Sequence, residues 1–222
     1  MTLRSKFFAM TYDRQMARVE KAGLGAFRER LLAGANGRVL EIGAGTGANL
    51  TFYGPAVGSL TMTEPEIPML RRLERKVREQ SPATTVLRAP AEDLPFSDDC
   101  FDVAVSTLVL CGVDDQPRAL RELRRVLRPG GQLLFFEHVR STDAKLARFQ
   151  DRMNGINRFM VGCDCNRPTL DIIGEAGFAV TQVEHIVWPK VPKFARPAIV
   201  GSATAPAGAR SHDAHLAKGT QP

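Results

Sequence analysis

Apolar residues form short unbroken runs that alternate with longer segments in which they recur every three or four positions. The unbroken runs are typical of strands buried on both faces, and the periodic segments are typical of amphipathic helices. Strands are predicted at residues 38–42, 60–63, 84–87, 101–106, 132–136, 178–187 and 199–204. Helices are predicted at residues 1–35, 69–79, 119–127 and 169–176. This alternation predicts an α/β fold with a doubly wound, mainly parallel sheet of seven strands.

The domain organisation follows from where this alternation breaks. A chain of 222 residues is expected to form one domain. Residues 37–204 carry the α/β pattern, interrupted at about 140–168 by a segment that we interpret as an insertion over the sheet edge. Residues 1–36 are interpreted as an N-terminal helical lid. Residues 205–222 are rich in Ala, Gly, Pro and Ser and are expected to be disordered.

The charge of the chain is +6, from 30 basic and 24 acidic residues, and the excess lies mostly in three helical segments at 4–30, 71–79 and 118–128. A solvated helix face explains it, with nucleic acid or an anionic membrane as alternatives. No apolar run approaches the roughly 20 residues of a membrane span, and no secretory signal is recognised. The four cysteines suggest no disulfide framework, so a reducing, cytoplasmic location is expected.

A glycine loop directly follows the first predicted strand, with the sequence Gly43-Ala44-Gly45-Thr46-Gly47-Ala48. This is the nucleotide-binding position of a doubly wound sheet, because glycines allow a tight turn and a close approach of the ligand. The stretch also satisfies the G-x-G-x-x-A pattern of dinucleotide sites. A tight turn without a ligand is the remaining alternative.

Two carboxylates bear on the nature of the ligand. Glu41 ends the strand before the glycines, where it would repel a diphosphate and attract an ammonium group. S-adenosylmethionine carries an α-ammonium and a sulfonium and no phosphate. Glu64 ends the second predicted strand, where a carboxylate can accept hydrogen bonds from ribose hydroxyls. A solvated loop carboxylate is the alternative for Glu64.

Four motifs in the expected order resemble those of the class I S-adenosylmethionine-dependent methyltransferases. They are Val39 to Gly47, Ala91-Glu92-Asp93-Leu94-Pro95-Phe96, Phe101-Asp102-Val103 and Leu127-Arg128-Pro129-Gly130-Gly131. Further stretches are similar to the methyltransferase-like group that includes the alkyl-thiol methyltransferases. They are Thr107 to Cys111, Phe135 to Val139, Gly162-Cys163, Arg167 with Thr169, and the segments Gly47-Ala48-Asn49 and Phe52-Tyr53. The small quinone and phospholipid methyltransferases share the core motifs.

The resemblance implies a Rossmann-like class I methyltransferase fold, S-adenosyl-L-methionine as cofactor and S-adenosyl-L-homocysteine as product. The implied cofactor-binding residues are Glu41, Gly43, Gly45, Gly47, Asn49, Glu64, Pro65, Ala91, Glu92 and Thr107. Glu41 and the glycines would line the methionyl end, with Thr107 near it, and Glu64 would hold the ribose. Ala91 and Glu92 would face the adenine. Pro90 stands where many relatives have an acidic residue, which shifts the expected adenine contact toward Glu92.

Methyl transfer from a sulfonium mainly requires that the acceptor be positioned and water excluded. A thiol acceptor must also lose its proton. His138 is the candidate base, because it ends the fifth predicted strand and an imidazole titrates near neutrality; a structural histidine is the alternative. Tyr12 is the second candidate, on a helix with Phe7 and Phe8 that would close over the cofactor. That helix could instead simply cover apolar surface.

Cys163-Asp164-Cys165 raises the question of a metal. Zinc sites use four ligands, usually from pairs spaced C-x₂₋₄-C, and this C-x-C has no second pair in the sequence. We therefore expect no metal, and interpret the segment as a loop lining the acceptor pocket or as carrying a redox-sensitive thiol.

The sequence thus predicts an enzyme that methylates a small lipophilic acceptor, with a thiol favoured. A quinone or phenol, a phospholipid amine, or a non-catalytic S-adenosylmethionine-binding module are the alternatives. A nucleic-acid methyltransferase ranks lower, because Ser106-Thr107-Leu108-Val109 stands where an Asn/Asp-Pro-Pro-aromatic tetrapeptide would be expected. No nucleic-acid partner is expected. The resembling thiol enzymes carry a hydrophobic N-terminal membrane anchor, and no counterpart of it is expected here. Peripheral membrane contact and oligomeric state stay open.

Overall fold

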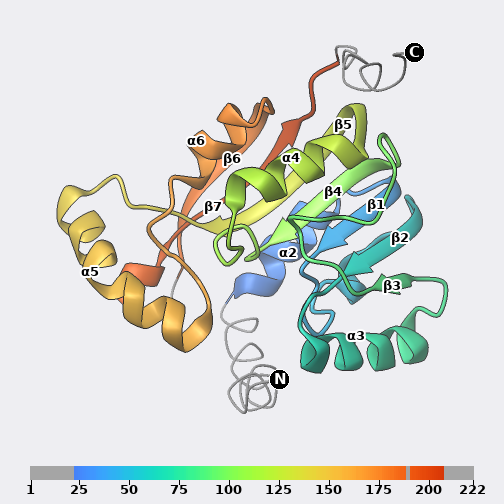
Figure 1. The fold of residues 1–222 in the computed structure, drawn as a ribbon, viewed down its shortest axis with the longest axis horizontal. Helices are drawn as coiled ribbons and strands as arrows, with labels where there is room; N and C mark the ends of the chain where they lie inside the picture. Colours follow the sequence, from blue (N-terminus) through green and yellow to red (C-terminus); the bar gives the residue numbers. More distant parts are fainter. Residues whose placement is uncertain (1–22, 189–190, 208–222) are drawn as a thin grey trace, which may run out of the picture.

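The computed structural model describes residues 23–188 and 191–207, which form one α/β unit (Figure 1). Its strands are β1 (Gly37–Ile42), β2 (Val57–Thr63), β3 (Thr85–Leu87), β4 (Phe101–Thr107), β5 (Leu127–His138), β6 (Ala179–Val187) and β7 (Pro197–Thr204). Its helices are α2 (Gly25–Leu32), α3 (Ile67–Gln80), α4 (Gln116–Val126), α5 (Ala144–Val161) and α6 (Thr169–Glu175), with short 3₁₀ turns η2 (Leu50–Phe52) and η3 (Lys193–Ala195). All seven predicted strands are present.

The strands form a single sheet in the order β3-β2-β1-β4-β5-β7-β6. The five strands β3, β2, β1, β4 and β5 run parallel to one another. β7 runs antiparallel to both β5 and β6. The predicted doubly wound, mainly parallel fold is therefore confirmed. The chain winds outward from β1 to β3 and then returns to β4 beside β1. Ligands of such sheets bind at the carboxyl ends of the strands that flank this switch point.

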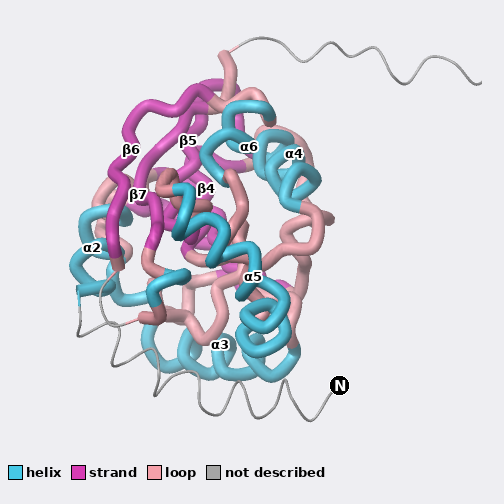
Figure 2. Tube along the Cα trace, turned by 90° about the vertical axis from the view of Figure 1, so that its left-hand side faces the viewer, coloured by secondary structure: helices cyan, strands magenta, loops and turns pink. Residues whose placement is uncertain are grey.

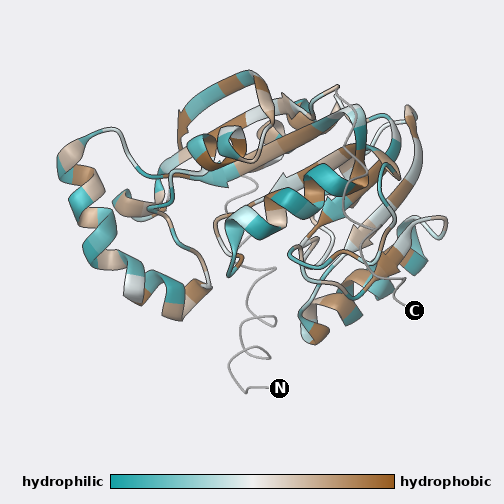
Figure 3. Cartoon of the chain, turned by 45° about the horizontal axis from the view of Figure 1, so that its top comes forward, coloured by the Kyte–Doolittle hydropathy of each residue, from teal (hydrophilic) through white to brown (hydrophobic). Residues whose placement is uncertain are grey.

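Helices cover both faces of the sheet (Figure 2). On one face, α4 and α6 pack on alternate residues of β1, β4 and β5, with Leu40, Ala104 and Phe135 at the centre of the core. On the other face, α2 and α3 pack on the intervening residues, among them Val39, Val105 and Phe136. The central strands are accordingly mostly apolar, as Figure 3 shows. Because side chains alternate between faces, Glu41 and Thr107 point toward α2, whereas Glu137 points toward the α4 face.

The basic outer face of α4 has a structural use. Arg125 forms an ion pair with Glu122 and donates to the carbonyls of Leu94 and Phe96, so it ties the helix to the loop before β4. Asp115 caps the helix by accepting the N–H of Arg118. Arg125, one of the basic residues of this helix, therefore has a structural role.

The predicted insertion contains α5, which begins at the capping residue Asp143 and ends at Gly162 in the left-handed conformation. Figure 1 shows that this helix extends beyond the end of the sheet. The hydrophobic pattern does not predict this helix, because the buried face of α5 includes the polar residues Gln150 and Asn157. Gln150 accepts the N–H of Ser141 and donates to carbonyls that include Val139 and Cys165.

Both ends of the chain bear on the predicted boundaries. Ala205 is buried and its N–H donates to the carbonyl of Gly131, so the ordered core extends past the predicted boundary at residue 204. Most of the predicted tail, residues 208–222, lies outside the described residues, as do residues 1–22 of the predicted lid and with them Tyr12.

Candidate cofactor and acceptor site

The glycine loop lies at the carboxyl end of β1, at the switch point of the sheet. Gly43, Gly45 and Gly47 all have positive φ, at 54°, 60° and 80°, a conformation that other residues rarely adopt. A Cβ on Gly43 would lie 2.7 Å from the side chain of Val109, so this glycine also permits close packing against the loop after β4. A Cβ on Gly45 would meet no atom within 4 Å. The loop therefore leaves open space at its centre.

A buried polar network flanks this loop. Glu41 accepts hydrogen bonds from Asn49 Nδ2 at 3.0 Å and from the Tyr53 hydroxyl at 2.7 Å. Asn49 Nδ2 also donates to Thr107 Oγ1 at 2.9 Å, while Arg28 donates to Asn49 Oδ1 at 2.6 Å and to Thr107 Oγ1 at 3.2 Å. The network joins α2, β1, the glycine loop and β4. Three of the predicted cofactor residues, Glu41, Asn49 and Thr107, are therefore direct neighbours.

The electrostatics of the network depend on burial. Burial raises the pKa of Glu41 to about 7, against the opposing effects of the Tyr53 and Asn49 hydrogen bonds and the nearby charge of Arg28. Burial also raises the pKa of Tyr53 well above its usual value, so its hydroxyl stays protonated and donates to Glu41. A cationic group placed beside Glu41 would favour the ionised carboxylate.

Arg28 was not anticipated from the sequence, although it is only 3% exposed and donates hydrogen bonds to two members of this network. It occurs in a segment with several other basic residues, and the sequence pattern does not distinguish one buried arginine from its exposed neighbours. Tyr53 belongs to the segment Phe52-Tyr53 that resembles the methyltransferase-like group, but its hydrogen bond to Glu41 was not anticipated.

Glu64 connects the ends of β1 and β2. Its carboxylate accepts the N–H of Gly45 at 2.8 Å and that of Glu66 at 2.9 Å. Burial raises the pKa of this carboxyl group. The geometry places Glu64 against the glycine loop, as a ribose-binding residue requires, while the contact with ribose stays a prediction. Pro65 follows directly, and its carbonyl accepts from Arg88 Nε.

Ala91 and Glu92 lie in the segment after β3. Ala91 is buried. The Glu92 carboxylate accepts the N–H groups of Asp114 at 2.9 Å and Asp115 at 3.3 Å, so it fixes the start of α4. The sequence does not predict these two hydrogen bonds of Glu92. The adenine contact of Ala91 and Glu92 stays a prediction, and Glu92 has a structural task beside it.

Glu137 organises the loop that leads from β4 toward α4. Its fully buried carboxylate accepts from Ser106 Oγ at 2.6 Å and from the N–H groups of Val109, Leu110 and Cys111, each at 3.1 Å. The loop includes Leu108 with φ 61°, a strained conformation for this residue. Four hydrogen bonds on one carboxylate hold the loop in place beside Gly43. Glu137 belongs to a stretch that resembles the thiol methyltransferases, but the sequence pattern indicates no role for it.

His138, the candidate base, lies at the carboxyl end of β5 as predicted, but its environment differs from the one expected. Its ring stacks on Trp188 with centroids 5.3 Å apart, and Nδ1 lies 3.3 Å from Cys163 Sγ. Burial lowers the pKa of His138 to about 4, so the expected titration near neutrality is corrected: the imidazole is neutral at physiological pH. A buried ring is costly to charge, which the sequence pattern does not reveal.

A cavity of about 360 Å³ lies next to the end of β5, at the far side of His138 from β4. Its lining includes Val139, Ser141, Leu146, Ile186 and Pro197. None of its lining residues belongs to the glycine loop, so it is separate from the cofactor cradle.

In the part of the chain that the structure describes, no helix combines the length and apolar character needed to cross a membrane.

The residues at the switch point fit S-adenosylmethionine better than a dinucleotide. The open space over Gly45 admits a ligand, and the buried carboxylates of Glu41 and Glu64 lie on either side of the loop. A diphosphate there would face two carboxylates, whereas an ammonium and ribose hydroxyls would find acceptors.

Comparisons with known proteins agree with this fit. Residues 40–135 match the model of a family described as a methyltransferase domain. The chain is similar to thiol S-methyltransferase TMT1A of Homo sapiens, with 32% identity over 88% of this chain and 82% of that protein. It is also similar to a phosphatidylethanolamine N-methyltransferase of Cereibacter sphaeroides, with 30% identity over 66% of this chain and 77% of that protein.

Solved structures share the fold. A methyltransferase from Thermotoga maritima, described as a possible histamine N-methyltransferase, superposes with a TM-score of 0.68 at 24% identity. The superposition covers 92% of this chain and all of that one. A geranyl diphosphate C-methyltransferase from Streptomyces coelicolor, solved with S-adenosyl-L-homocysteine, gives a TM-score of 0.66 at 14% identity and covers 82% of this chain and 78% of its own.

Proposed function

Because the chain belongs to the S-adenosylmethionine-dependent methyltransferase family that includes the TMT1 thiol S-methyltransferases, we propose that it methylates a small lipophilic thiol. The observation that carries the cofactor assignment is the open cradle at Gly45 between two buried carboxylates. The thiol assignment is supported by the similarity to TMT1A over most of both chains. A phospholipid amine is the second candidate, supported by the similarity to the phosphatidylethanolamine enzyme.

S-adenosylmethionine supplies an activated methyl group on a sulfonium, so the residues of this chain need only bind, orient and exclude water. Glu41, held by Asn49 and Tyr53, would accept the α-ammonium, and Glu64 would accept from the ribose. Arg28 donates hydrogen bonds to Asn49 and Thr107 and so fixes the orientation of both side chains. Glu137 holds the loop at residues 109–111 against the glycine loop.

A thiol acceptor loses its proton more readily than an alcohol: the thiol of cysteine, for example, has an ordinary pKa of about 8.5 and is a few per cent thiolate at neutral pH. His138 is neutral and largely buried, with a pKa of about 4, so it would hold an accepted proton only weakly. The proposed mechanism therefore relies on positioning of the thiolate and assigns no resident base to His138.

An acceptor screen tests this proposal. The enzyme and S-adenosylmethionine are incubated with a small alkyl thiol, a quinol or phenol, and phosphatidylethanolamine vesicles, and methylated products are identified by mass spectrometry. We expect the thioether as the main product. Methylation of the phospholipid amine in its place would favour the second candidate. Cofactor binding without transfer to any acceptor would instead favour a non-catalytic module.

Cofactor affinity is expected to fall at acid pH because of Glu41. Its pKa of about 7 means that the carboxyl group is mostly ionised at pH 7.5 and mostly protonated at pH 5.5, where it no longer attracts an ammonium. Binding of the cation therefore releases a proton at low pH, and the dissociation constant is expected to be about tenfold higher at pH 5.5. Calorimetric titrations at both pH values measure this change.

Glu41→Gln is the matched control for the pH profile. The amide keeps the size of the side chain and cannot ionise, so its affinity should be about tenfold or more below wild type at pH 7.5 and nearly independent of pH. A wild-type pH dependence in this variant would show that another group carries the effect.

A further inference from the structure

Three segments far apart in the sequence bring a cluster of sulfur and nitrogen atoms together at the carboxyl ends of β4 and β5. Cys111 follows β4, His138 ends β5, and Cys163 follows α5. Cys163 Sγ lies 3.1 Å from Cys111 Sγ and 3.3 Å from His138 Nδ1, and Cys111 Sγ lies 3.8 Å from the same nitrogen. Cys165 Sγ lies 3.8 Å from Cys163 Sγ. All four cysteines of the chain are free, so no disulfide joins these sulfurs.

The spacing is close to that of a tetrahedral zinc site. With Zn–S near 2.3 Å and Zn–N near 2.0 Å, the ligand atoms of such a site are about 3.8 Å apart for two sulfurs and about 3.5 Å apart for sulfur and nitrogen. The Cys163–Cys165 separation already has this value, and the Cys163–His138 separation is slightly shorter. The Cys111–Cys163 pair must widen, and Cys165 Sγ must move inward, because the ligand atoms that all lie within 4.8 Å of one another are those of Cys111, His138 and Cys163. Three thiols and an imidazole are also the donor types that zinc prefers.

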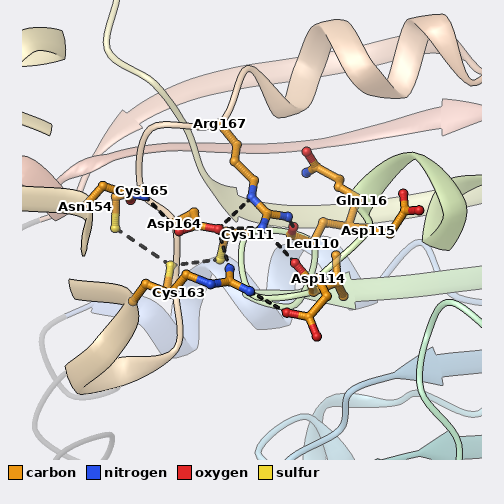
Figure 4. Close-up of polar contacts among 12 residues, drawn as sticks. Leu110, Cys111, Asp114, Asp115, Gln116, Asn154, Cys163, Asp164, Cys165 and Arg167 are labelled. Atoms are coloured by element: carbon orange, nitrogen blue, oxygen red, sulfur yellow. Dashed lines mark hydrogen bonds and ion pairs between the residues drawn. The ribbon is translucent and has the colours of Figure 1, made fainter. Parts of the chain in front are cut away.

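The protein around the cluster fixes its backbone. The Glu137 carboxylate holds the N–H of Cys111, while Asp164 N donates to the Cys111 carbonyl at 2.8 Å. Arg167 donates to the Leu110 carbonyl and pairs with Asp164, so the loop at residues 162–167 is clamped to the loop after β4 (Figure 4). Such fixed loops preorganise ligands that the sequence separates by more than 50 residues.

Two contacts also orient the ligand side chains. Asn157 Nδ2 donates to Cys165 Sγ at 3.3 Å, as the outer hydrogen bonds of zinc-bound thiolates do. The stack on Trp188 fixes the plane of the His138 ring with Nδ1 toward the sulfurs. Figure 4 shows the Cys163 sulfur between those of Cys111 and Cys165, while the Asp164 side chain turns toward Arg167.

We propose that Cys111, His138, Cys163 and Cys165 form a binding site for Zn²⁺, with three thiolate ligands and one imidazole ligand. On binding, the three thiols release their protons to solvent and the neutral imidazole coordinates through Nδ1. The ion would join the ends of β4 and β5 to the segment after α5. The proposal does not depend on the identity of the methyl acceptor.

Titration of the reduced, metal-free full chain with Co²⁺ tests this site, since Co²⁺ reports its ligands in its absorption spectrum. We expect one ion per chain, intense visible bands typical of four-coordinate Co²⁺, a thiolate-to-metal charge-transfer band, and displacement of all these bands by Zn²⁺. Absence of the charge-transfer band, or a weak spectrum of six-coordinate Co²⁺, would overturn the proposal.

Single cysteine variants identify the ligands. Cys163→Ser should weaken Zn²⁺ binding at least about a hundredfold, more than the loss of a residue that only orients a ligand. Cys165→Ser should lower the charge-transfer intensity by about a third, one of three thiolates. Cys100→Ser is the matched control, because Cys100 lies at the amino end of β4, whereas the proposed ligands lie beyond the carboxyl ends of the strands. This variant should bind Zn²⁺ as the wild type does. Wild-type affinity in Cys163→Ser would contradict the assignment.

Thiol counting distinguishes the site from a redox-active pair. The denatured, metal-free protein is expected to show four reactive thiols without added reductant. A count of two, restored to four by reductant, would show a disulfide in place of the metal site and overturn the proposal. S-adenosylmethionine binding, measured on the same variants, separates this outcome from a failure of the proposed methyltransferase function.

Discussion

Replacing Gly45 by valine is expected to abolish S-adenosylmethionine binding, with an affinity at least about a hundredfold lower than that of the wild type. At this position a Cβ meets no protein atom within 4 Å, so the space over Gly45 is available to a ligand and a branched side chain would fill it. The φ of 60° adds strain, because a left-handed conformation costs a residue with a Cβ roughly 1–2 kcal/mol. Calorimetric titration of the purified variant measures the loss.

Gly130→Val separates occlusion from strain. Gly130 also has a positive φ, of 75°, and an added Cβ there would likewise meet no atom within 4 Å, but it lies near the start of β5, away from the carboxyl edge. This variant should lose a comparable amount of stability and keep its affinity for the cofactor. Equal losses of affinity in both variants, or wild-type affinity in Gly45→Val, would show that the loop does not contact the ligand.

Glu137→Ala is expected to destabilise the fold by about 3–5 kcal/mol, because it removes the acceptor of four buried hydrogen bonds. The substitution leaves the N–H groups of Val109, Leu110 and Cys111 and the Ser106 hydroxyl without their acceptor. Each unsatisfied buried donor costs about 1–3 kcal/mol, and local relaxation recovers part of the sum. Urea denaturation followed by circular dichroism measures the change.

Ser106→Ala provides the matched comparison, since it removes one hydrogen bond to the same carboxylate and leaves three. A loss of about 1 kcal/mol is expected there. If Glu137→Ala were no more destabilising than Ser106→Ala, the carboxylate would not organise the loop between β4 and α4, and its contribution to the site would have to be reconsidered.

The parts of the site predicted from sequence are those that follow from local backbone requirements. A glycine loop after a buried strand predicts a ligand position, because three positive φ angles are needed there and only glycine supplies them readily. Glu41 lies at the end of β1 beside this loop because it belongs to the same short segment, while its contact with the cofactor stays a prediction. Its partners Asn49 and Thr107 came from the resemblance to known methyltransferases.

The parts that were missed depend on contacts between distant segments. Arg28 is buried only because α2 packs over the ends of β1 and β4, and nothing in its own segment distinguishes it from exposed arginines. α5 was missed because its buried face includes Gln150 and Asn157, which bond to backbone atoms rather than pack in an apolar core. The absence of a second C-x-C pair argued against a metal, whereas the fold brings Cys111 and His138 to Cys163 from β4 and β5.

The most direct test of the cofactor site is a pair of calorimetric titrations of the full chain near pH 7.5, one with S-adenosylmethionine and one with NADH. Binding of S-adenosylmethionine in the micromolar range at one site per chain, with no heat from NADH, is the predicted result. Binding of NADH alone would contradict it, since a diphosphate would then occupy a cradle flanked by the carboxylates of Glu41 and Glu64.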